Sequence, residues 1–258
     1  MLSKNRIKYI HSLELKKKRN EERAFVAEGP KLVGDLLGHF DCRYIAATDS
    51  WMEKNTAFLE LLSKQRCEID TVTDEELRKA SFLDTPQQVL AVFSQKSSDE
   101  TCFSEIVGSS LCIALDDVQN PGNLGTIIRL ADWFGIEHIF CSSGSADVYN
   151  PKTIQATMGS IARVNVHYCD LKKLIASLPG VPVYGTFLDG NDIYDEKLEQ
   201  RGIIVMGNEG RGVSEEIEKM VTSRLYVPNY PSDRETGESL NVAIATAIVC
   251  SEFRRRAR

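Results

Sequence analysis

The chain has 258 residues, enough for one large domain or two smaller ones that each bury a core. Its 42% hydrophobic and 26% charged residues are typical of a soluble globular protein. No apolar run approaches the ~18 to 20 residues of a membrane span, and the start MLSKNRIKYIHS lacks the apolar centre of a secretory signal. These features predict a cytoplasmic protein. The seven cysteines form no C-x-x-C pair and the four histidines no H-E-x-x-H pattern, so neither a metal site nor a disulfide framework is predicted.

The net charge of −6 is unevenly distributed along the chain. Residues 1–31 hold nine Lys or Arg against four Glu, and the final RRRAR adds four more basic residues, so the region between the ends is acidic. Each basic run by itself is typical of a solvated helix face or a chain terminus. The two together favour a polyanionic partner.

Strands and helices alternate in the first half of the chain. A charged, helix-prone stretch over 14–23 precedes AFVAEGPKLVGDLLGHF, in which an apolar extended start is followed by a helix. The pattern then predicts strand, helix, strand, helix and strand at CRYIAAT, AFLELLSKQ, EIDTVT, DEELRKASF and QQVLAVFSQ. Thr73 or Asp74 would cap the second of these helices. We expect a compact α/β domain over 1–95 and a polar linker over 96–110 with one short helical turn.

A second α/β domain is predicted over 111–258. Its strands are LCIALDDV, HIFCSS, RVNVHY, PVYGTFL, GIIVMGN and SRLYVPN, with helices between them and a last long helix from Ser239. Such alternation predicts a mostly parallel sheet covered on both faces. Ligands in these sheets bind at the carboxyl ends of the strands.

The first loop of interest is NPGNLGTIIRL, residues 120–130. Pro121 and Gly122 favour a turn, Asn123 can bond the nearby backbone, and a helix is predicted from about Leu124. Arg129 follows six residues after Asn123. By itself it would be taken as an ordinary surface arginine.

The second loop, GNEGRGVS over 207–214, comes within one residue of the phosphate-binding pattern G-x-x-x-x-G-K-[ST]. Val213 stands where the lysine would be, and Glu209 places a carboxylate where phosphates need neutral or positive groups. The spacing G-x-x-G-x-G also differs from the dinucleotide pattern. The loop therefore favours a neutral or cationic ligand.

The third loop ends in SLNVAIATAIVC. Ser239 and Asn241 bracket Leu240 at the start of a helix that is apolar nearly all round, which predicts burial in the core or in a subunit interface. Ser239 alone would be explained as a helix N-cap.

Together the three loops closely resemble the motifs of the SpoU/TrmH branch of the SPOUT RNA methyltransferases. The motifs are N-x-G-x-[IL]-x-R, G-x-E-G-x-G and S-L-N-V before an apolar helix, and here they occur in order at predicted strand ends over about 115 residues. The segment RNEERAFVAEGPKLVGDLL also resembles the small, ribosomal-protein-like substrate-binding domain that precedes the catalytic domain in many members.

The resemblance implies a homodimer whose catalytic domain carries a C-terminal trefoil knot over roughly 183–250, an exception to the rule that connections do not thread loops. It implies S-adenosylmethionine as cofactor and RNA as partner, with the ribose 2′-hydroxyl as acceptor and no metal. The cofactor would lie bent in the knot, contacted at Phe187, Gly207, Asn208, Gly210, Val227 and Leu240. A sulfonium cofactor needs no phosphate-binding lysine, and a carboxylate beside it is tolerable.

By the same resemblance, Arg129 would activate the hydroxyl or clamp the adjacent phosphate. Asn123 and Glu209 would orient Arg129, while Ser239 and Asn241 would position substrate and loop. Because the pKa of arginine lies above about 12, phosphate clamping and electrostatic stabilisation are favoured over proton abstraction.

Ribosomal RNA of the 23S type is the favoured substrate, because of the N-terminal domain. Transfer RNA is the first alternative, and the others are a non-catalytic ribosome-assembly factor of the same fold and a nucleotide-dependent enzyme. The loop over 229–238 is longer than the family pattern, and its Asp233, Arg234 and Glu235 could reshape the acceptor entrance.

Overall fold

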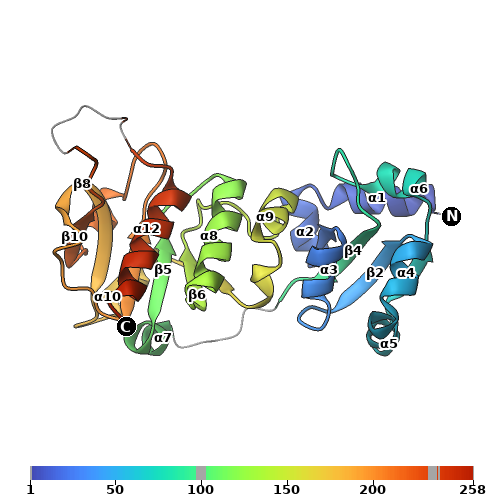
Figure 1. Ribbon diagram of the computed structural model, residues 1–258, viewed down its shortest axis with the longest axis horizontal. Coiled ribbons are helices and arrows are strands. Elements are labelled where there is room, and N and C mark those ends of the chain that lie inside the picture. Colours follow the sequence, from blue (N-terminus) through green and yellow to red (C-terminus); the bar gives the residue numbers. More distant parts are fainter. Residues whose placement is uncertain (1, 97–102, 232–236, 238, 258) are drawn as a thin grey trace. The chain divides into compact units, whose positions relative to one another are not determined.

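A computed structural model describes residues 2–96, 103–231, 237 and 239–257 (Figure 1). The chain divides into two compact units, Met1–Ser97 with Asp147–Ala162 and Ser98–Ala146 with Arg163–Arg258. The chain therefore passes from one unit to the other three times. Within the described residues, no helix combines the length and the apolar character that a membrane crossing requires.

The first unit contains a four-stranded sheet in the order β1-β4-β2-β3. β4 is antiparallel to both β1 and β2, and β2 is parallel to β3. The strands are β1 (Ala24–Glu28), β2 (Cys42–Ala47), β3 (Glu68–Thr71) and β4 (Val89–Ser94). The helices are α1 (Lys4–Ser12), α2 (Lys16–Glu22), α3 (Pro30–Leu36), α4 (Asp49–Lys54), α5 (Thr56–Lys64) and α6 (Asp74–Ala80). The predicted alternation of strands and helices from residue 14 onward is confirmed, whereas α1 and α4 were not among the predicted elements.

The start of α6 follows its predicted chemistry. The Thr73 hydroxyl accepts a hydrogen bond from the Glu76 amide at 3.2 Å, and the Glu76 carboxylate accepts one from the Thr73 amide at 3.1 Å. This reciprocal capping box satisfies two amides that a helix start would otherwise leave unpaired. Leu77 on the same helix is buried with Ile10 of α1 and Val92 of β4 in one hydrophobic cluster.

A segment from the second half of the sequence completes the first unit. Residues 147–162, with helix α9 (Pro151–Thr157) and a 3₁₀ turn (Ser160–Ala162), pack against β1 and α3. The Tyr149 ring lies 4.9 Å from the Phe25 ring of β1, and its hydroxyl accepts a hydrogen bond from the Lys96 amide at 3.1 Å. The sequence pattern gave no sign of this exchange of chain between the two halves.

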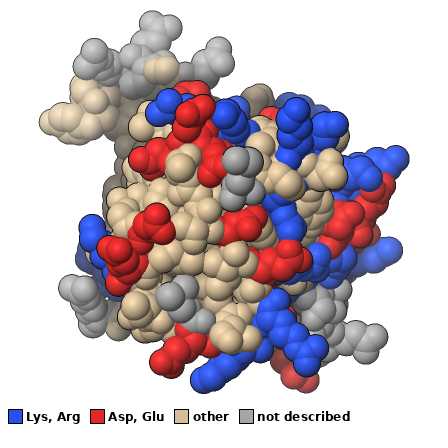
Figure 2. All heavy atoms as spheres, turned by 90° about the vertical axis from the view of Figure 1, so that its right-hand side faces the viewer, with Lys and Arg blue, Asp and Glu red and all other residues tan. Residues whose placement is uncertain are grey.

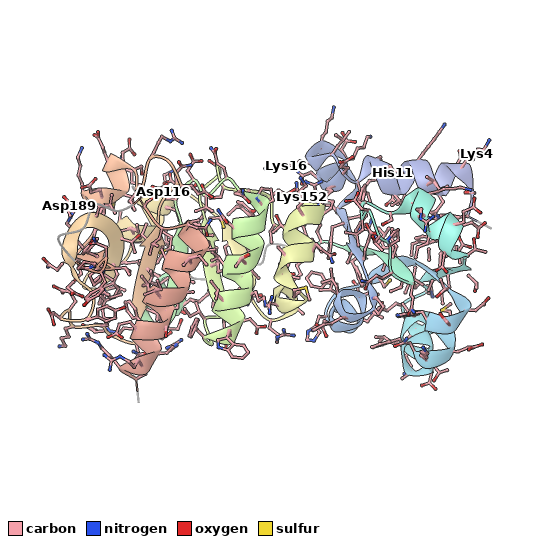
Figure 3. All side chains as sticks on the ribbon, turned by 45° about the horizontal axis from the view of Figure 1, so that its top comes forward. Lys4, His11, Lys16, Asp116, Lys152 and Asp189 are labelled. Atoms are coloured by element: carbon pink, nitrogen blue, oxygen red, sulfur yellow. The ribbon has the colours of Figure 1, made fainter. Side chains whose placement is uncertain are left out.

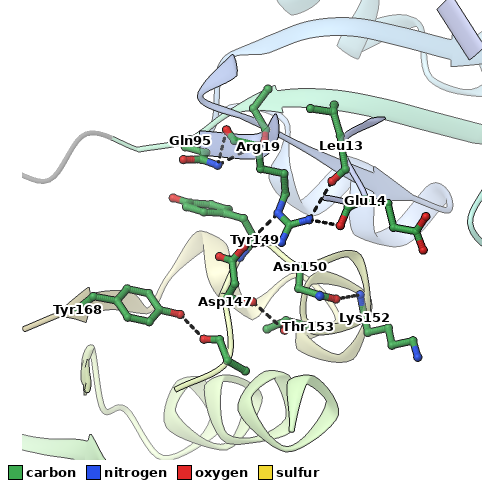
Figure 4. Close-up of polar contacts among 12 residues, drawn as sticks. Leu13, Glu14, Arg19, Gln95, Asp147, Tyr149, Asn150, Lys152, Thr153 and Tyr168 are labelled. Atoms are coloured by element: carbon green, nitrogen blue, oxygen red, sulfur yellow. Dashed lines mark hydrogen bonds and ion pairs between the residues drawn. The ribbon is translucent and has the colours of Figure 1, made fainter. Parts of the chain in front are cut away.

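Arg19 of α2 fastens this segment, as Figure 4 shows. Its side chain is 2% exposed and donates two hydrogen bonds to Asp147 Oδ2, at 2.5 and 3.0 Å. The remaining guanidinium nitrogen donates to the carbonyls of Leu13 and Glu14 at 2.9 and 2.6 Å. The charge is thus both paired and hydrogen-bonded, which burial of a charge requires.

The basic ends of the chain are less available to a partner than their charge implies. Arg19 is buried, and three arginines of the C-terminal run bond within their own unit. Arg254 donates to the carbonyls of Phe134 and Gly135, and Arg255 and Arg256 both pair with Glu252. These contacts hold the end of the last helix in place.

Exposed lysines remain on α1 and α2. Lys4, Lys8 and Lys16 make no ion pair with any side chain that the structure describes, whereas Lys18 pairs with Glu21. Figure 3 labels Lys4 and Lys16, and Figure 2 shows basic and acidic side chains interspersed over this side of the molecule. Lys4 and Lys8 lie one turn apart and therefore project from one side of α1.

The second unit is built on a six-stranded sheet in the order β10-β8-β9-β5-β6-β7, in which every neighbouring pair is parallel. The strands are β5 (Leu111–Leu115), β6 (His138–Cys141), β7 (Asn165–Tyr168), β8 (Val183–Asp192), β9 (Gly202–Met206) and β10 (Ser223–Tyr226). The helices are α7 (Phe103–Ser109), α8 (Pro121–Trp133), α10 (Leu171–Ala176), α11 (Glu215–Glu218) and α12 (Val242–Arg255). The predicted parallel α/β fold is confirmed.

Helices cover both faces of this sheet. Alternate strand residues point to opposite faces, so the apolar residues of the strands pack against helices on both sides. Cys112 and Ala114 of β5 join a cluster with residues of α7, α10 and α11. On the other face α8 and α12 lie side by side, and the Phe253 ring of α12 contacts the Tyr184 ring of β8 at 4.9 Å. The described end of the expected linker, residues 103–109, is helix α7 with Val107 fully buried, while residues 97–102 lie outside the described part.

β8 is interrupted in its pairing with β10. Tyr184 and Gly185 pair with Ser223 and Arg224, after which the next partners are Asn191 and Asp192. The intervening residues 186–190 leave the ladder. A Cβ on Gly190 would lie 2.7 Å from the Leu225 carbonyl carbon, so only glycine permits the strand to return this close to β10.

His138 of β6 and His167 of β7 form a contact that we expect to be sensitive to acid. His138 Nδ1 lies 3.0 Å from His167 Nε2 with the rings stacked, and burial, followed by the neighbouring His138, lowers the pKa of His167 to about 4. The neutral pair forms at pH 7; its contribution to stability declines as the pH falls below about 6.5, the unfolded pKa, and is lost near 4. The wild type should therefore exceed His167→Gln in the free energy of unfolding at pH 7, and this gap should narrow toward pH 4. Urea unfolding from pH 7 to pH 4 measures this difference in the free energy of unfolding. A difference that does not change with pH would contradict the lowered pKa of His167.

Candidate functional site

The site is placed by the topology of the six-stranded sheet. β5 lies between β9 and β6, and the chain that leaves β5 continues to β6 and β7 on one side, while β9, β8 and β10 lie on the other. In open parallel sheets, ligands bind where the strand order reverses in this way, at the carboxyl ends of the strands. The loops that follow β5 and β9, residues 116–120 and 207–214, meet there.

α8 begins three residues before its predicted start. Asn120 is the N-cap, and its Oδ1 accepts hydrogen bonds from the amides of Gly122 and Asn123 at 2.8 and 3.2 Å. Pro121 then occupies the first helical position, which suits its fixed φ and missing N–H. The bond to nearby backbone that was expected from the Asn123 side chain is made by the Asn120 side chain.

The Asn123 side chain instead joins the three loops. Its Nδ2 donates to Glu209 Oε1 at 2.8 Å, and its Oδ1 accepts from Asn241 Nδ2 at 3.2 Å. Asn241 Oδ1 in turn caps α12 by accepting from the amides of Ala243 and Ile244. An amide side chain suits position 123, since Asn123 both donates and accepts here. We refer to Asn123, Glu209 and Asn241 as the amide bridge.

The loop 207–214 is shaped by its own Asn and Gly residues. Asn208 and Gly212 exchange two backbone hydrogen bonds at 2.9 Å, and Asn208 Oδ1 accepts from the amides of Gly210 and Arg211. Gly212 has φ +72°, and a Cβ on Gly207 would overlap the backbone of Gly212. This tight turn leaves the Glu209 side chain exposed beside Asn123.

Two acidic residues after β5 complete the site and were not singled out from the sequence. The buried Asp116 accepts a hydrogen bond from the Ser214 amide at 2.8 Å, and Asp117 forms an ion pair with Arg211. The Asp117 carbonyl also accepts from Asn208 Nδ2 at 2.8 Å. The adjacent carboxylates at the end of a buried strand were the available signal. They lock the loops after β5 and β9 to each other.

Arg129 and Ser239 lie outside the amide bridge. Arg129 is exposed on α8, and six residues of helix turn it well away from the direction of Asn123. Among the described residues it makes no hydrogen bond to Asn123 or Glu209. Ser239 is exposed and is not the N-cap of α12, because that position is taken by Asn241.

The other residues proposed for the cofactor flank these loops. Phe187 lies in the interrupted part of β8, with the Arg224 guanidinium 3.7 Å above its ring. Val227 follows β10 and is partly buried, while Leu240 precedes α12 and is 51% exposed. Arg224 also pairs with Asp189 and holds the pKa of that carboxyl below its usual value. Gly210 lies at the exposed tip of the loop.

Residues 232–236 and 238, including Asp233, Arg234 and Glu235 of the expanded loop, lie outside the described residues. Within the described ranges, no three His, Cys, Asp or Glu side chains are grouped so that they could hold a metal ion.

Comparison with known proteins identifies the family of this site. The SpoU rRNA Methylase family matches residues 110–251, more than half of the chain and all three loops. The chain belongs to the SpoU rRNA methylase family. The MRM3-like substrate binding domain matches residues 4–91. The resemblance inferred from the three sequence motifs is thus confirmed at the level of the family.

Relatives of the SpoU family match over the full chain. The 23S rRNA (guanosine(2553)-2′-O)-methyltransferase RlmP of Bacillus subtilis is 29% identical over 96% of both chains. A solved structure from Porphyromonas gingivalis, assigned to the TrmH family of RNA methyltransferases, is 42% identical with a TM-score of 0.85 over 99% of both chains. The AdoMet-bound rRNA methyltransferase from Sinorhizobium meliloti is 29% identical with a TM-score of 0.87, covering 100% of this chain and 97% of that one.

Proposed function

We propose that this protein transfers a methyl group from S-adenosylmethionine to a ribose 2′-hydroxyl of 23S-type ribosomal RNA. The observation that carries the proposal is the amide bridge, which joins the three family motifs at the carboxyl ends of the strands. The full-length similarity to a 23S rRNA 2′-O-methyltransferase supports the acceptor. The AdoMet-bound relative from Sinorhizobium meliloti supports the cofactor.

The chemistry of the loops fits S-adenosylmethionine. The loop 207–214 presents backbone groups and the Glu209 carboxylate but contains no lysine, so it suits a positively charged sulfonium better than a row of phosphates. Phe187, Val227 and the half-exposed Leu240 supply apolar contacts for an adenine ring. We propose these three residues with Gly207, Asn208 and Gly210 as the cofactor site, within a C-terminal knot over 183–250.

The bound cofactor supplies an activated methyl group, and the chain supplies orientation and charge. Arg129, exposed and held on a rigid helix, would clamp the phosphate next to the acceptor and stabilise negative charge that develops on the ribose oxygen. The amide bridge would fix the loops so that the acceptor is aligned with the methyl group. Ser239, exposed before α12, would contact the substrate.

We further propose that residues 1–95 bind RNA, that 96–110 link them to the catalytic domain 111–258, whose residues 147–162 pack within the first unit, and that the protein is a homodimer. The match of residues 4–91 to a substrate-binding domain supports the first assignment. The layer formed by α8 and α12 supports the dimer, because it exposes 84% of Trp133 and 54% of Ile244. Large apolar side chains exposed on one helical layer are typical of protein interfaces.

The test is transfer of labelled methyl groups to ribosomal and transfer RNA that lack endogenous modification. Label in ribosomal RNA only, stable to alkali because the 2′-oxygen is blocked, is the expected result. Label in transfer RNA alone would show that transfer RNA, and not ribosomal RNA, is the substrate. If the protein binds the cofactor but labels neither pool, two explanations remain. Either the acceptor is an assembling ribosomal particle, or the protein binds RNA without catalysing transfer.

The exposed lysines of α1 give a prediction for RNA binding. Changing Lys4 and Lys8 to Gln should weaken RNA binding and reduce the slope of log affinity against log salt by roughly 1 to 1.5, since each phosphate contact contributes about 0.7. Fluorescence anisotropy at several salt concentrations measures both effects. Lys54 and Lys64, which end α4 and α5, are the matched charge-removal control. Equal losses in the two double variants would show that only net charge matters.

Two substitutions of Asn241 separate helix capping from the amide bridge. Asn241→Ala should lose both, with a cost of about 1 kcal/mol in stability. Asn241→Asp keeps the cap, because aspartate is an equally good N-cap, but it loses the donor to Asn123. We expect near wild-type stability for Asn241→Asp with methyl transfer reduced by about tenfold or more. Urea unfolding and initial rates measure the pair; a fully active Asn241→Asp protein would rule out a role for the bridge.

A further inference from the structure

Two thiols in the first unit are brought together by the parallel pairing of β2 and β3. Cys42 is the first residue of β2, and Cys67 directly precedes β3, whose Glu68 pairs with Tyr44. Their Sγ atoms lie 3.5 Å apart. The strands themselves therefore determine this contact.

The backbone at both cysteines is fixed by hydrogen bonds. The Cys42 amide donates to the Gln65 side chain at 2.9 Å, and the Cys67 amide donates to the Leu62 carbonyl at 3.0 Å. Among the cysteines that the structure describes, this is the one pair whose sulfur atoms are in contact. Cys112 and Cys250 are buried, and the buried Cys141 accepts a backbone hydrogen bond from the Cys169 amide at 3.0 Å without a sulfur–sulfur hydrogen bond among the described residues. The pair is thus set apart by position as well as by distance.

The two thiols differ in access and in acidity. Cys67 is partly exposed, whereas Cys42 is 2% exposed. The pKa of Cys67 is lowered because the Cys42 thiol donates a hydrogen bond to the Cys67 thiolate, and the pKa of Cys42 is raised by the same contact and by burial. The thiolate is the reactive form in exchange, so the exposed sulfur is also the more nucleophilic one.

We propose that Cys42 and Cys67 are a reversible redox site that closes to a disulfide on reaction with a low-molecular-weight disulfide such as oxidised glutathione. The Cys67 thiolate attacks one sulfur of the oxidant, forms a mixed disulfide and releases the first thiolate. Cys42 then loses its proton and attacks Cys67 Sγ, which expels the second thiolate. Overall two protein thiols are oxidised, one oxidant disulfide is reduced to two thiols, and a thiol reductant reverses the exchange.

The bond would act on the edge of the four-stranded sheet. β3 is an edge strand paired with β2 alone, and its four residues have little burial. The disulfide would close the chain from Cys42 to Cys67 around α4 and α5, and so restrict the unfolded chain. Oxidation should therefore raise the unfolding temperature of the protein by several degrees.

The experiment uses the full chain with Cys102→Ser, because Cys102 lies outside the described residues. The protein is incubated with oxidised glutathione under native conditions, its free thiols are alkylated, and it is digested without reductant for mass spectrometry. We expect Cys42 and Cys67 peptides joined with the loss of two hydrogens, and dithiothreitol should release them. In Cys42→Ser the intermediate should persist as a single glutathione adduct on Cys67, while Cys67→Ser should form neither.

Cys169→Ser is the matched control, because Cys169 is another half-buried cysteine and makes no sulfur–sulfur hydrogen bond within the described residues, although it lies beside Cys141. It should still form the Cys42–Cys67 bond and show the same rise in unfolding temperature. Glutathione retained on Cys67 while Cys42 stays reduced would overturn the proposal, as would full resistance of both thiols. Neither readout depends on methyl transfer, so this result stands apart from the proposed enzymatic function.

Discussion

Alanine at position 129 is expected to lower the single-turnover rate of methyl transfer by about 10²- to 10³-fold, the range found when one charge-stabilising donor is removed from an active site. Affinity for S-adenosylmethionine should remain within about twofold, because Arg129 lies outside the loop 207–214 and makes no contact with the amide bridge in the described residues. Single-turnover methylation and calorimetric cofactor binding measure the two quantities separately.

Lysine at the same position distinguishes the type of contact. Arg129→Lys keeps the charge but loses the planar pair of donors that grips a phosphate, so partial activity is expected. Thr126→Ala, one turn earlier on the exposed side of α8, is the matched control and should be active. If Arg129→Ala is active, Arg129 has no part in the mechanism. If its cofactor affinity falls as much as its transfer rate, Arg129 supports the structure of the site and does not act in the transfer step.

Loss of the Arg19 side chain is expected to have the largest effect on stability. Arg19→Ala leaves the Asp147 carboxylate, only 12% exposed at its side chain, without its cationic partner, and such changes typically cost 3 to 5 kcal/mol. The carbonyls of Leu13 and Glu14 lose their donor as well. Urea unfolding should show the destabilisation directly.

A double variant tests whether the cost comes from the unpaired charge. Arg19→Met with Asp147→Asn removes both charges while keeping most of the volume, and should recover a large part of the stability lost in Arg19→Met alone. Arg23→Ala, an exposed arginine directly after α2, should change stability by less than about 1 kcal/mol. If the effects of Arg19→Met and Asp147→Asn on the free energy of unfolding simply add in the double variant, the two side chains do not stabilise each other.

The repeating parts of the fold could be predicted because periodicity and capping are local. Thr73 and Glu76 indicate the start of α6, and the apolar run Leu111–Leu115 indicates a central strand. The interruption of β8 could not be predicted, since it depends on Gly190 approaching Leu225 of a later strand. Neither could the burial of Arg19, whose partner lies 128 residues away.

For the candidate site, residue types and spacing predicted the three loops but not the contacts between them. Asn120 and Pro121 together indicate a helix start, three residues before the predicted start near Leu124. Ser239 and Asn241 are equally good caps in sequence, and only the path of the chain into α12 selects Asn241. The roles assigned to Arg129 and Ser239 remain predictions.

The Arg19 to Asp147 pair also bears on how chains of this family can be recombined. A chimera joined near residue 97, the obvious crossover point for exchanging RNA specificity, would take Arg19 and Phe25 from one parent and Asp147 and Tyr149 from the other. Parents whose residues 147–162 have diverged would then leave a buried charge or a void. A functional exchange should therefore transplant residues 147–162 together with the N-terminal half, as two cassettes inherited as one.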